Sequence, residues 1–547
     1  YSDPRDDGYF AGDVFPEGPM RPREGVQRGS VMDFPSSYPG NPVGGPDGDQ
    51  HLAVKDAPSI TKIPVLPLSY GDAQPLLAAL RGPLAPREWR GALPITYHVG
   101  PGPAKVHLRV MSNWEMKKVY DVIARIPGAV EPEQWVVRGN HHDAWVNGAE
   151  DPVSGQVALL EEARALGQLL KQGWKPRRTI LYCAWDGEEP MLLGSTAWGE
   201  AHADELRHKA VAYLNSDTNG RGYLFFSGSH ILEHFLNAVA RDIPDPESGL
   251  SVWKRHQLHD IAEARSAEER QELRQRPDLR LAALGSGTDY TVFLDHLGVP
   301  ALNLGYGGED PGGIYHSIYD DFYWYSHFSD TDFVYGRALA QTAGTAVLRL
   351  ADAEVLPYEF TDLADTVHVY LKQLQELLKQ QQEEVRERDR ELDEGVFRAA
   401  MDPRRPTVAP AREEVPPHLD FAPLENAADA LTRSAARYQK ALAQARERAG
   451  AALPAASLEA LNATLLESER KLTDPAGLPR RPWYQHMLYA PGVYTGYDVK
   501  TVPGVREAIE QKRWAEADSE ILRVAKVLEN EAALLDSATA ELEALGK

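Results

Sequence analysis

Cysteine is almost absent from this chain, which has one such residue, Cys183, among 547. A single cysteine excludes an intramolecular disulfide framework and leaves the redox compartment open. Long apolar runs are also missing, since none reaches the roughly 20 residues that a membrane-spanning helix needs. The first ten residues lack a basic region followed by an apolar stretch, which is not typical of a signal peptide. We therefore expect neither a membrane span nor a targeting segment within this chain.

Positive charge is also scarce, because 58 Lys and Arg face 81 Asp and Glu, for a net charge of −23. Nucleic-acid binding normally requires clustered Lys and Arg to meet the phosphate backbone, so this balance argues against a nucleic-acid partner. A hydrophobic content of 43% and a charged content of 25% are ordinary globular values. The length is sufficient for two or three domains with cores of their own.

Composition divides the chain into three zones. The first, residues 1–115, begins with a stretch rich in Gly, Pro and Asp up to residue 58, where we expect mainly loops. A short αβ stretch follows, with a β-like run and then a helix that opens near Asp72. Residues 105–126 have a strand-like pattern and lead into the next zone.

The second zone, residues 116–354, alternates apolar strand-like runs with amphipathic helical segments. Such alternation predicts an α/β fold with a mixed, mostly parallel sheet flanked by helices. The third zone, residues 355–547, carries helical spacing over nearly its whole length. A sheet covered by its own helices does not need these further helices, so we expect them to form a separate helical domain.

Residues suited to zinc lie in the second zone, where strands are predicted to end. Imidazole nitrogen and carboxylate oxygen are both zinc ligands. The carboxyl ends of parallel strands meet at one edge of a sheet, where ligands bind. The candidate metal ligands are His141, Asp151, Glu189, Asp217 and His316.

Two neighbouring carboxylates accompany these ligands. Glu188 directly precedes Glu189, and adjacent side chains diverge, so one can bind metal while the other acts as general base for a metal-bound water. Asp143, two residues after His141, could orient that imidazole. The pattern therefore predicts a metal-dependent hydrolase.

The same segments resemble a known family. The strings HHDAWVNGAEDPVSG, WDGEEPMLLGSTAW, LGSGTDY and YHSIYDD closely resemble, in order, the zinc peptidase domain of the glutamate carboxypeptidase II and transferrin receptor family. VQRGS and IPVLPLSYGDAQPLL look like the end of the apical (protease-associated) domain of that family. LPRRPWYQHMLYAPG looks like its helical dimerisation domain. By this resemblance the chain begins inside the apical domain, and the first piece of the peptidase domain would be absent.

The resemblance implies a co-catalytic di-zinc exopeptidase that acts on small peptides and forms a homodimer through residues 355–547. Asp151 would bridge two zinc ions, with His141 and Asp217 on one and Glu189 and His316 on the other. Glu188 would be the base that activates a metal-bridging water. Tyr315 would donate a hydrogen bond to the tetrahedral intermediate. The implied substrate-binding residues are Ser286, Gly287, Thr288 and Tyr497. Relatives work outside the cytoplasm, so a periplasmic or secreted location is implied.

Several positions depart from the glutamate-directed members of the family. Asn303 and Gly305 stand where arginines line the substrate pocket, and Gly496 precedes Tyr497 where a lysine is usual. Ser30 replaces an asparagine of the apical segment. These changes indicate a neutral or broad specificity. The positions that also differ near the metal ligands are Pro190, which replaces an aromatic residue, and Ala197, which with Glu200 leaves a structural calcium site open.

Two alternatives compete with this interpretation. His230 to His234 matches the inverted zinc-peptidase motif H-x-x-E-H, with both histidines on one helix face. A non-catalytic, transferrin-receptor-like binding protein of the same fold is the other alternative, although it would require lost metal ligands. A final prediction concerns the bond from Asp151 to Pro152, which we expect to be cis because X-Pro bonds adopt cis readily and the bridging carboxylate must be aimed closely.

Overall fold

The computed structural model describes residues 1–3, 12–29, 31, 52–57, 59–402, 404, 408–449 and 454–544. These residues form two compact units, Tyr1–Tyr358 and Glu359–Lys547. In the described part of the chain, no helix combines the length and apolar character required to cross a membrane.

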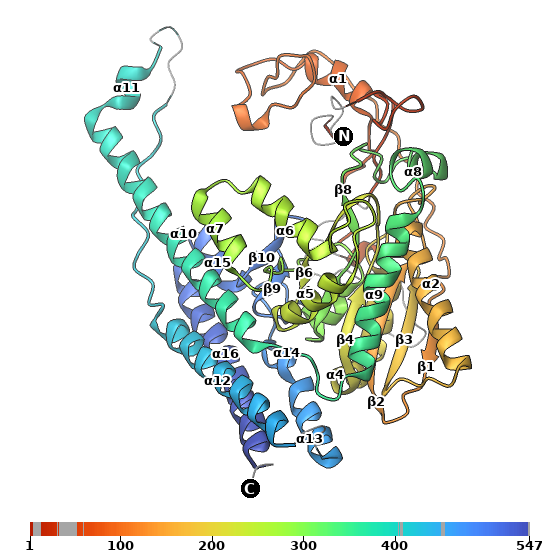
Figure 1. Ribbon diagram of the computed structural model, residues 1–547. Coiled ribbons are helices and arrows are strands. Elements are labelled where there is room, and N and C mark those ends of the chain that lie inside the picture. The colour runs from red at the N-terminus through yellow and green to blue at the C-terminus, as the bar shows by residue number, and fades with distance from the viewer. Residues whose placement is uncertain are drawn as a thin grey trace. The chain divides into compact units, whose positions relative to one another are not determined.

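The first unit is built on a six-stranded sheet with the order β1-β3-β2-β4-β7-β6 (Figure 1). The four central strands run parallel, and the two edge strands are antiparallel to their neighbours. The predicted mixed, mostly parallel sheet is therefore confirmed. Its strands are β1 (Val122–Ile126), β2 (Glu131–His141), β3 (Arg178–Trp185), β4 (Ala210–Asn215), β6 (Ser227–Gly228) and β7 (Ala301–Asn303).

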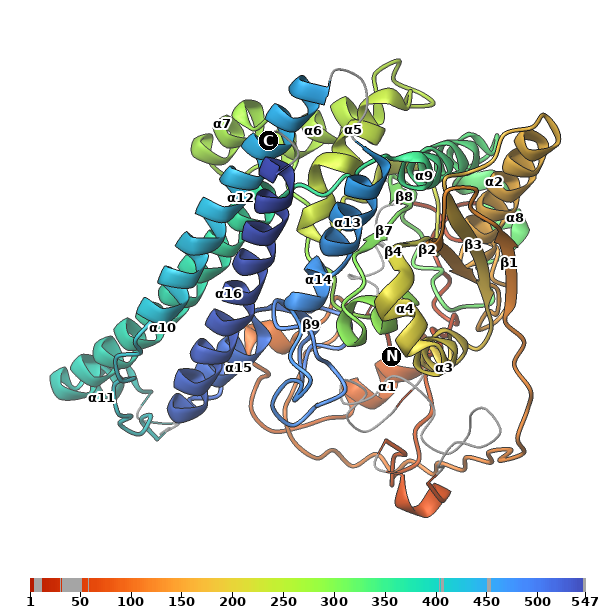
Figure 2. The same cartoon turned by 90° about the horizontal axis from the view of Figure 1, so that it is seen from below.

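Helices cover both faces of this sheet, as Figure 2 shows. On one face lie α2 (Val153–Lys171) and α9 (Val334–Asp352), which pack against each other and against the central strands. On the other lie α3 (Leu193–Ala201), α4 (Ala203–Lys209) and the π-helix η5 (Val292–His296). Burial on both faces explains why β3 and β4 consist almost entirely of buried residues rather than alternating apolar and polar ones.

The register of the parallel strands brings their carboxyl ends to one edge. His141 pairs with Trp185 at the ends of β2 and β3, and Gly139 pairs with Asn215 at the end of β4. The chain then leaves each strand into a loop that carries candidate ligands. The alignment follows from the even spacing of the parallel ladder.

The remaining elements of the first unit are short. They comprise η2 (Val54–Asp56), α1 (Tyr70–Ala78), η3 (Arg87–Trp89), β5 (Gly222–Leu224), η4 (His230–Leu232), α5 (Glu233–Asp242), α6 (Val252–Glu263), α7 (Ala267–Gln275), β8 (Tyr306–Gly308) and α8 (Phe322–Phe328). Helix α1 opens at Ser69, whose hydroxyl accepts a hydrogen bond from the backbone N–H of Asp72.

The strand-like pattern predicted over residues 105–126 is wrong for most of its length, because only β1 at its end forms a strand. Residues 105–121 have no regular structure, and their apolar side chains, among them Val106 and Met111, are exposed. A strand needs a hydrogen-bonding neighbour, and among the described residues this segment has no strand partner.

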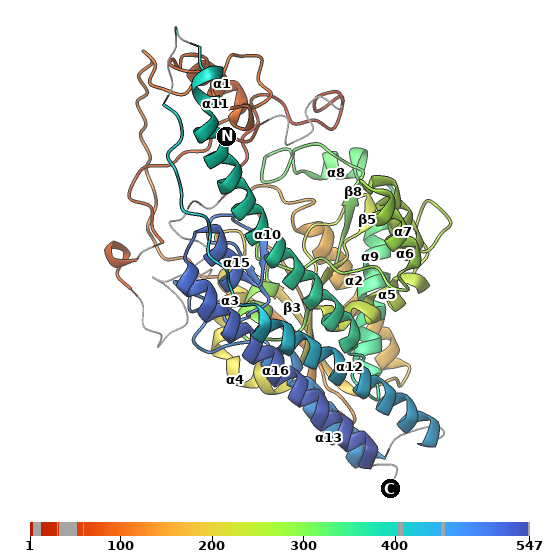
Figure 3. The same ribbon diagram turned by 90° about the vertical axis from the view of Figure 1, so that its left-hand side faces the viewer.

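The second unit is mainly helical. Its long helices α10 (Phe360–Glu394), α12 (Ala422–Ala449) and α16 (Trp514–Ala544) lie side by side, with α12 packed on both others (Figure 3). The predicted helical zone is confirmed. The unit also contains α11 (Val396–Ala400), α13 (Ala455–Leu466), α14 (Ser468–Lys471), β9 (Tyr489–Pro491), β10 (Val499–Thr501) and α15 (Pro503–Glu510).

Candidate metal centre

The five predicted ligands come together at the carboxyl edge of the sheet. Within the described residues they form two groups of potential metal ligands that share Asp151. In each group one ligand atom per residue lies within 4.8 Å of the others. The groups are His141, Asp151 and Asp217, and Asp151, Glu189 and His316.

Asp151 presents one carboxylate oxygen to each group. Its Oδ1 lies 3.4 Å from Nε2 of His141, and its Oδ2 lies 3.2 Å from Nε2 of His316. A carboxylate that faces two imidazoles from its two oxygens has the arrangement needed to bridge two cations. The predicted cis peptide between Asp151 and Pro152 is confirmed.

The remaining two carboxylates complete the groups. Oδ1 of Asp217 lies 3.0 Å from Nε2 of His141, and Oε2 of Glu189 lies 3.1 Å from Nε2 of His316. Asp217 follows β4 directly after Ser216, whereas Glu189 follows β3 in the loop before α3. The loops after β3 and β4, the two strands that flank β2, therefore supply these carboxylates.

Each imidazole is fixed by a backbone carbonyl on its other nitrogen. Nδ1 of His141 lies 3.1 Å from the carbonyl oxygen of Asp143, and Nδ1 of His316 lies 3.0 Å from that of Arg28. Since a carbonyl oxygen can only accept, Nδ1 carries the proton in both rings. A neutral ring that carries its proton on Nδ1 keeps a lone pair on Nε2, and this is the tautomer that a metal ligand requires.

Backbone geometry at His316 is unusual and is held by the same segment. This residue has φ of 55°, in the left-handed region, and its carbonyl oxygen accepts a hydrogen bond from the N–H of Arg28 at 2.9 Å. Arg28 therefore contacts His316 through both its N–H and its carbonyl. A strained conformation held by several contacts is common at functional sites.

Glu188 lies beside His141 without belonging to either group. Its Oε2 is 3.8 Å from Nε2 of His141, farther than the oxygens of Asp151 and Asp217. Burial raises the pKa of Glu188 well above its usual value; His141 opposes this shift, and Asp217 adds to it. A buried carboxyl group that is not held by an arginine or lysine suits proton transfer.

The carboxylates of the centre outnumber its imidazoles, so the protein's own residues do not neutralise its negative charge. Burial acts to lower the pKa of His141, yet Asp217 and Glu188 raise it well above its usual value. Burial also acts to lower the pKa of His316, and hydrogen bonds to Asp151 and Glu189 raise it to about 9. These crowded carboxylates draw protons onto the imidazoles, which indicates that bound cations would compete for the same positions.

Asp143 contacts the imidazole of His141 and two backbone N–H groups. Its Oδ1 is 3.4 Å from Nδ1 of His141 and accepts the N–H of Glu188 at 3.0 Å. Its Oδ2 accepts the N–H of Glu189 at 3.2 Å. One carboxylate thus ties the imidazole of β2 to the two glutamates that follow β3.

Some residues that support the centre were missed by the sequence reasoning. Asp320 accepts hydrogen bonds from the N–H groups of Glu150 and Asp151, at 2.7 and 3.0 Å. The N–H of Trp145 donates to Oε1 of Glu189 at 2.9 Å. Asp320 lies in the string YHSIYDD and Trp145 in HHDAW, two segments that carry the family resemblance.

The predicted substrate-binding residues are placed in part. Thr288 is buried, and its Oγ1 accepts a hydrogen bond from Asn215, two residues before Asp217, at 3.1 Å. Gly287 adopts φ of 108°, and the carbonyl of Ser286 accepts a bond from Tyr290. The half-exposed ring of Tyr315 stacks on His316 at a centroid distance of 3.6 Å.

Tyr497 belongs to the second unit, where it lies exposed between β9 and β10. Ser30 lies outside the described residues. Ala197 and Glu200 both lie on α3, and neither is part of a group of three potential metal ligands within the described chain. These two positions therefore provide no support for a structural calcium site.

The competing H-x-x-E-H motif does not assemble a metal site among the described residues. His230 and Glu233 are buried, whereas His234 is mostly exposed and pairs with Asp278 at 2.7 Å. Glu233 is instead engaged by Arg276 at 2.9 Å. The two histidines thus have different surroundings.

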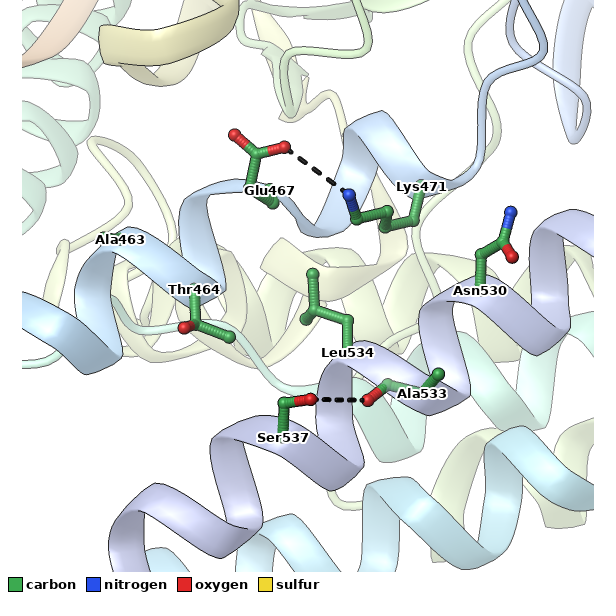
Figure 4. A pocket seen from close by; sticks show the side chains of 8 residues that line it. All are labelled: Ala463, Thr464, Glu467, Lys471, Asn530, Ala533, Leu534 and Ser537. Atoms are coloured by element: carbon green, nitrogen blue, oxygen red, sulfur yellow. Dashed lines mark hydrogen bonds and ion pairs between the residues drawn. The ribbon is translucent and has the colours of Figure 1, made fainter.

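A further pocket, of about 720 Å³, lies in the second unit (Figure 4). It is formed by α13, the end of α14 and α16, and an ion pair of 3.6 Å joins Glu467 to Lys471 at its rim. Its lining contains no histidine and a single carboxylate, so it lacks the ligands for a metal-dependent reaction.

The donor set of the centre fits zinc. Two neutral imidazole nitrogens and carboxylate oxygens are ordinary zinc ligands, and three protein ligands per ion leave a position open, as in catalytic sites. The shared Asp151 and the fixed Nδ1 atoms of both histidines are further features that such a site requires.

Comparison with known proteins agrees with this chemistry. Residues 121–331 match the model of peptidase family M28, and residues 419–536 match the transferrin receptor-like dimerisation domain. A probable glutamate carboxypeptidase of Arabidopsis thaliana, LAMP1, is 32% identical over 559 residues, which are 98% of this chain and 70% of that protein. The aminopeptidase NAALADL1 of Rattus norvegicus is 29% identical, with the same two coverages.

The chain spans a smaller share of some other relatives, such as 62% of the probable glutamate carboxypeptidase VP8 of Zea mays, at 32% identity over 89% of this chain. Among solved structures, the zinc aminopeptidase BSAP of Bacillus subtilis matches with a TM-score of 0.30 and 19% identity, over 43% of this chain and 50% of that one. The identity and coverage of the Arabidopsis relative show that the chain belongs to peptidase family M28, and it carries a transferrin receptor-like dimerisation domain.

Proposed function

We propose that this metallo-exopeptidase works with two zinc ions, one held by His141, Asp151 and Asp217 and the other by Asp151, Glu189 and His316. The observation that carries the proposal is the shared carboxylate, whose two oxygens face the two imidazoles at 3.4 and 3.2 Å. When bound, zinc supplies a Lewis acid for the peptide carbonyl and lowers the pKa of a water.

Glu188 is proposed as the general base. It takes a proton from the attacking water and returns it to the nitrogen of the leaving group. Its carboxylate lies 3.8 Å from Nε2 of His141 but belongs to neither ligand group, and the Asp143 carboxylate accepts a hydrogen bond from its N–H. Tyr315, half-exposed beside His316, is proposed to donate a hydrogen bond to the carbonyl oxygen as that oxygen gains negative charge.

The substrate is proposed to be a small peptide with a neutral or varied side chain. Asn303 and Gly305 carry no charge at the positions where we expect the substrate pocket, and the side-chain oxygen of Asn303 already accepts a hydrogen bond from Asn215 at 3.0 Å. Ser286, Gly287, Thr288 and Tyr497 are the proposed substrate-binding residues. Since relatives are named both carboxypeptidase and aminopeptidase, cleavage from either end must be tested.

The wider organisation is proposed as follows. Residues 1–115 would belong to an apical domain, residues 116–354 to the peptidase domain, and residues 355–547 to a helical domain through which two chains associate. An extracytoplasmic location follows from the resemblance. A non-catalytic binding role has the weaker support, because that role does not need five ligands in two groups.

The test is a hydrolysis panel of N-blocked and unblocked dipeptides with neutral, acidic and basic side chains. The expected result is release of product that stops on addition of a chelator and returns with two equivalents of zinc. Turnover of blocked substrates alone would identify a carboxypeptidase, and turnover of unblocked ones alone an aminopeptidase. Activity that survives complete metal removal, or no activity in the zinc-loaded chain, would refute the proposal.

A further inference from the structure

A fully buried ion pair lies beneath the metal centre. Arg138 on β2 and Glu162 on α2 both have side chains with no exposed surface, and they are joined by two hydrogen bonds of 3.1 and 2.9 Å. Charged side chains are rarely buried completely, and a buried ion pair is weak evidence for stability because desolvation is costly. The position of the pair therefore calls for a role other than holding the fold together.

Arg138 uses all five of its N–H groups. Two reach Glu162, two reach the carbonyl oxygens of Gly139 and Leu214 at 2.7 and 3.5 Å, and one reaches Oγ of Ser216 at 2.7 Å. A guanidinium has five donors in a rigid plane. Its orientation is thus fixed, and it clamps the end of β2 to the end of β4.

The hydroxyl of Ser216 connects Arg138 to Asn140. Because Arg138 can only donate, the Ser216 oxygen accepts a hydrogen bond from it. The Ser216 hydroxyl in turn donates a hydrogen bond to Oδ1 of Asn140, at 2.5 Å. The amide of Asn140 then points its N–H groups at the carbonyl oxygens of His141 and Pro152, at 2.8 and 3.4 Å. The donor and the acceptor of each hydrogen bond in this network are therefore determined.

Each end of this network adjoins a metal ligand. Ser216 precedes Asp217, Asn140 precedes His141, and Pro152 follows Asp151. Those three ligands form one of the two groups. The buried Gly155 of α2 lies against the same residues. A Cβ at this position would lie 2.1 Å from the carbonyl oxygen of Asp217 and 2.4 Å from Oδ1 of Asn140. A side chain at residue 155 would push both strand ends apart.

The second group is supported by other residues. The N–H of Trp145 holds Glu189, and the carbonyl of Arg28 holds His316. Neither belongs to the Arg138 network, and the groups share only Asp151. Asp143 contacts a residue of each group, but the Arg138 network adjoins only residues of the first group.

We infer that Arg138, Glu162, Ser216 and Asn140 are positioning residues that tune one metal position selectively, the one formed by His141, Asp151 and Asp217. The inference rests on the proposed two-zinc function. The network holds the carbonyl of His141 and the residues next to Asp151 and Asp217, so its loss lets the three ligands relax away from a common centre. Outer partners of metal ligands typically contribute about 10- to 100-fold to affinity.

The test uses Ser216→Ala, which deletes the hydroxyl between Arg138 and Asn140 and leaves every candidate ligand residue unchanged in the sequence. The metal-free full chain is titrated with Zn²⁺ in competition with a chromophoric chelator, and the number and affinity of sites are fitted. A Co²⁺ titration followed by visible absorption reports the geometry of each site. The matched control is Thr342→Val, which removes another fully buried hydroxyl of the same unit; this hydroxyl is bonded to Tyr306 at 2.8 Å and to the carbonyl of Ala338, not to a residue of the Arg138 network.

The expected result is two tight sites in the wild type and in Thr342→Val, and one site weakened about 10- to 100-fold in Ser216→Ala, with thermal unfolding shifted to a similar extent in both variants. Equal weakening of both sites, or two unchanged sites in the folded Ser216→Ala protein, would overturn the inference. Asn140→Ala supplies the same comparison if Ser216→Ala does not fold. A wild type that binds fewer than two ions would instead refute the two-zinc function, which separates the two failures.

Discussion

Replacement of Glu188 by Gln tests the division of labour between the two adjacent glutamates. The carboxylate of Glu188 stands 3.8 Å from Nε2 of His141 and is in neither ligand group, whereas Oε2 of Glu189 lies 3.1 Å from Nε2 of His316. Glu188→Gln preserves side-chain size and both ligand groups and removes only the proton acceptor. Turnover should therefore fall while two metal ions stay bound.

The magnitude follows from the role. A positioned general base contributes about 10²- to 10⁴-fold, which corresponds to about 3–5 kcal/mol of transition-state stabilisation. Because the change affects the chemical step alone, kcat should fall by this factor with KM nearly unchanged. Glu189→Gln should lower metal occupancy as well as kcat, since it removes a charged donor from one group.

The assay combines steady-state kinetics on the best dipeptide of the panel with metal content per chain after gel filtration. Glu205→Gln, an exposed residue of α4 that pairs with Lys209, serves as a control for which both quantities should be unchanged. A Glu188→Gln protein that keeps more than a tenth of wild-type kcat with both ions bound would refute the base assignment. Loss of a metal ion in the same variant would show that Glu188 is a ligand.

Three further predictions follow from the structure. Light scattering of the intact chain should give the mass of a dimer, which we expect to form through the helical domain. A mass of 60.6 kDa, that of one chain, at micromolar concentration would contradict this. Zinc added back to the metal-free chain should raise Tm in proportion to the logarithm of its concentration, as expected for a ligand that binds only the native state; a Tm independent of zinc would show that the ligand groups do not bind it. Burial raises the pKa of Glu531 on α16 to about 7, although the hydroxyl of Ser468 donates to it at 2.7 Å. The folded state then keeps a proton that the unfolded state loses above about pH 4.5, so the free energy of unfolding should fall by about 3 kcal/mol as pH rises from about 4.5 to 7. Glu531→Gln should abolish this loss, and chemical denaturation at pH 5 and 8 will measure it; equal pH dependence in both proteins would contradict the assignment.

Much of the fold could be predicted from local patterns. The apolar runs that became β2, β3 and β4 are bounded by polar residues, and the helical spacing of α10, α12 and α16 extends over many turns. Such signals depend on neighbours in sequence and are therefore visible without the fold. Residues 105–121 show the limit of this reasoning. Their apolar residues suggested strands, but among the described residues they have no strand partner, and pairing cannot be detected from one segment alone.

The sequence by itself determined which residue types could bind metal and where strands would deliver them, because each candidate ligand stands in a distinctive local string. It also indicated the cis bond before Pro152. Apart from Asp143, which stands close to His141 in the chain, only the tertiary structure decided what surrounds those ligands. Arg28, which fixes the Nδ1 proton of His316, lies 288 residues away from it, and Arg138 meets Ser216 across 78 residues. Hydrogen bonds between such distant groups depend on how the strands and loops are brought together, and no local pattern in the chain encodes them.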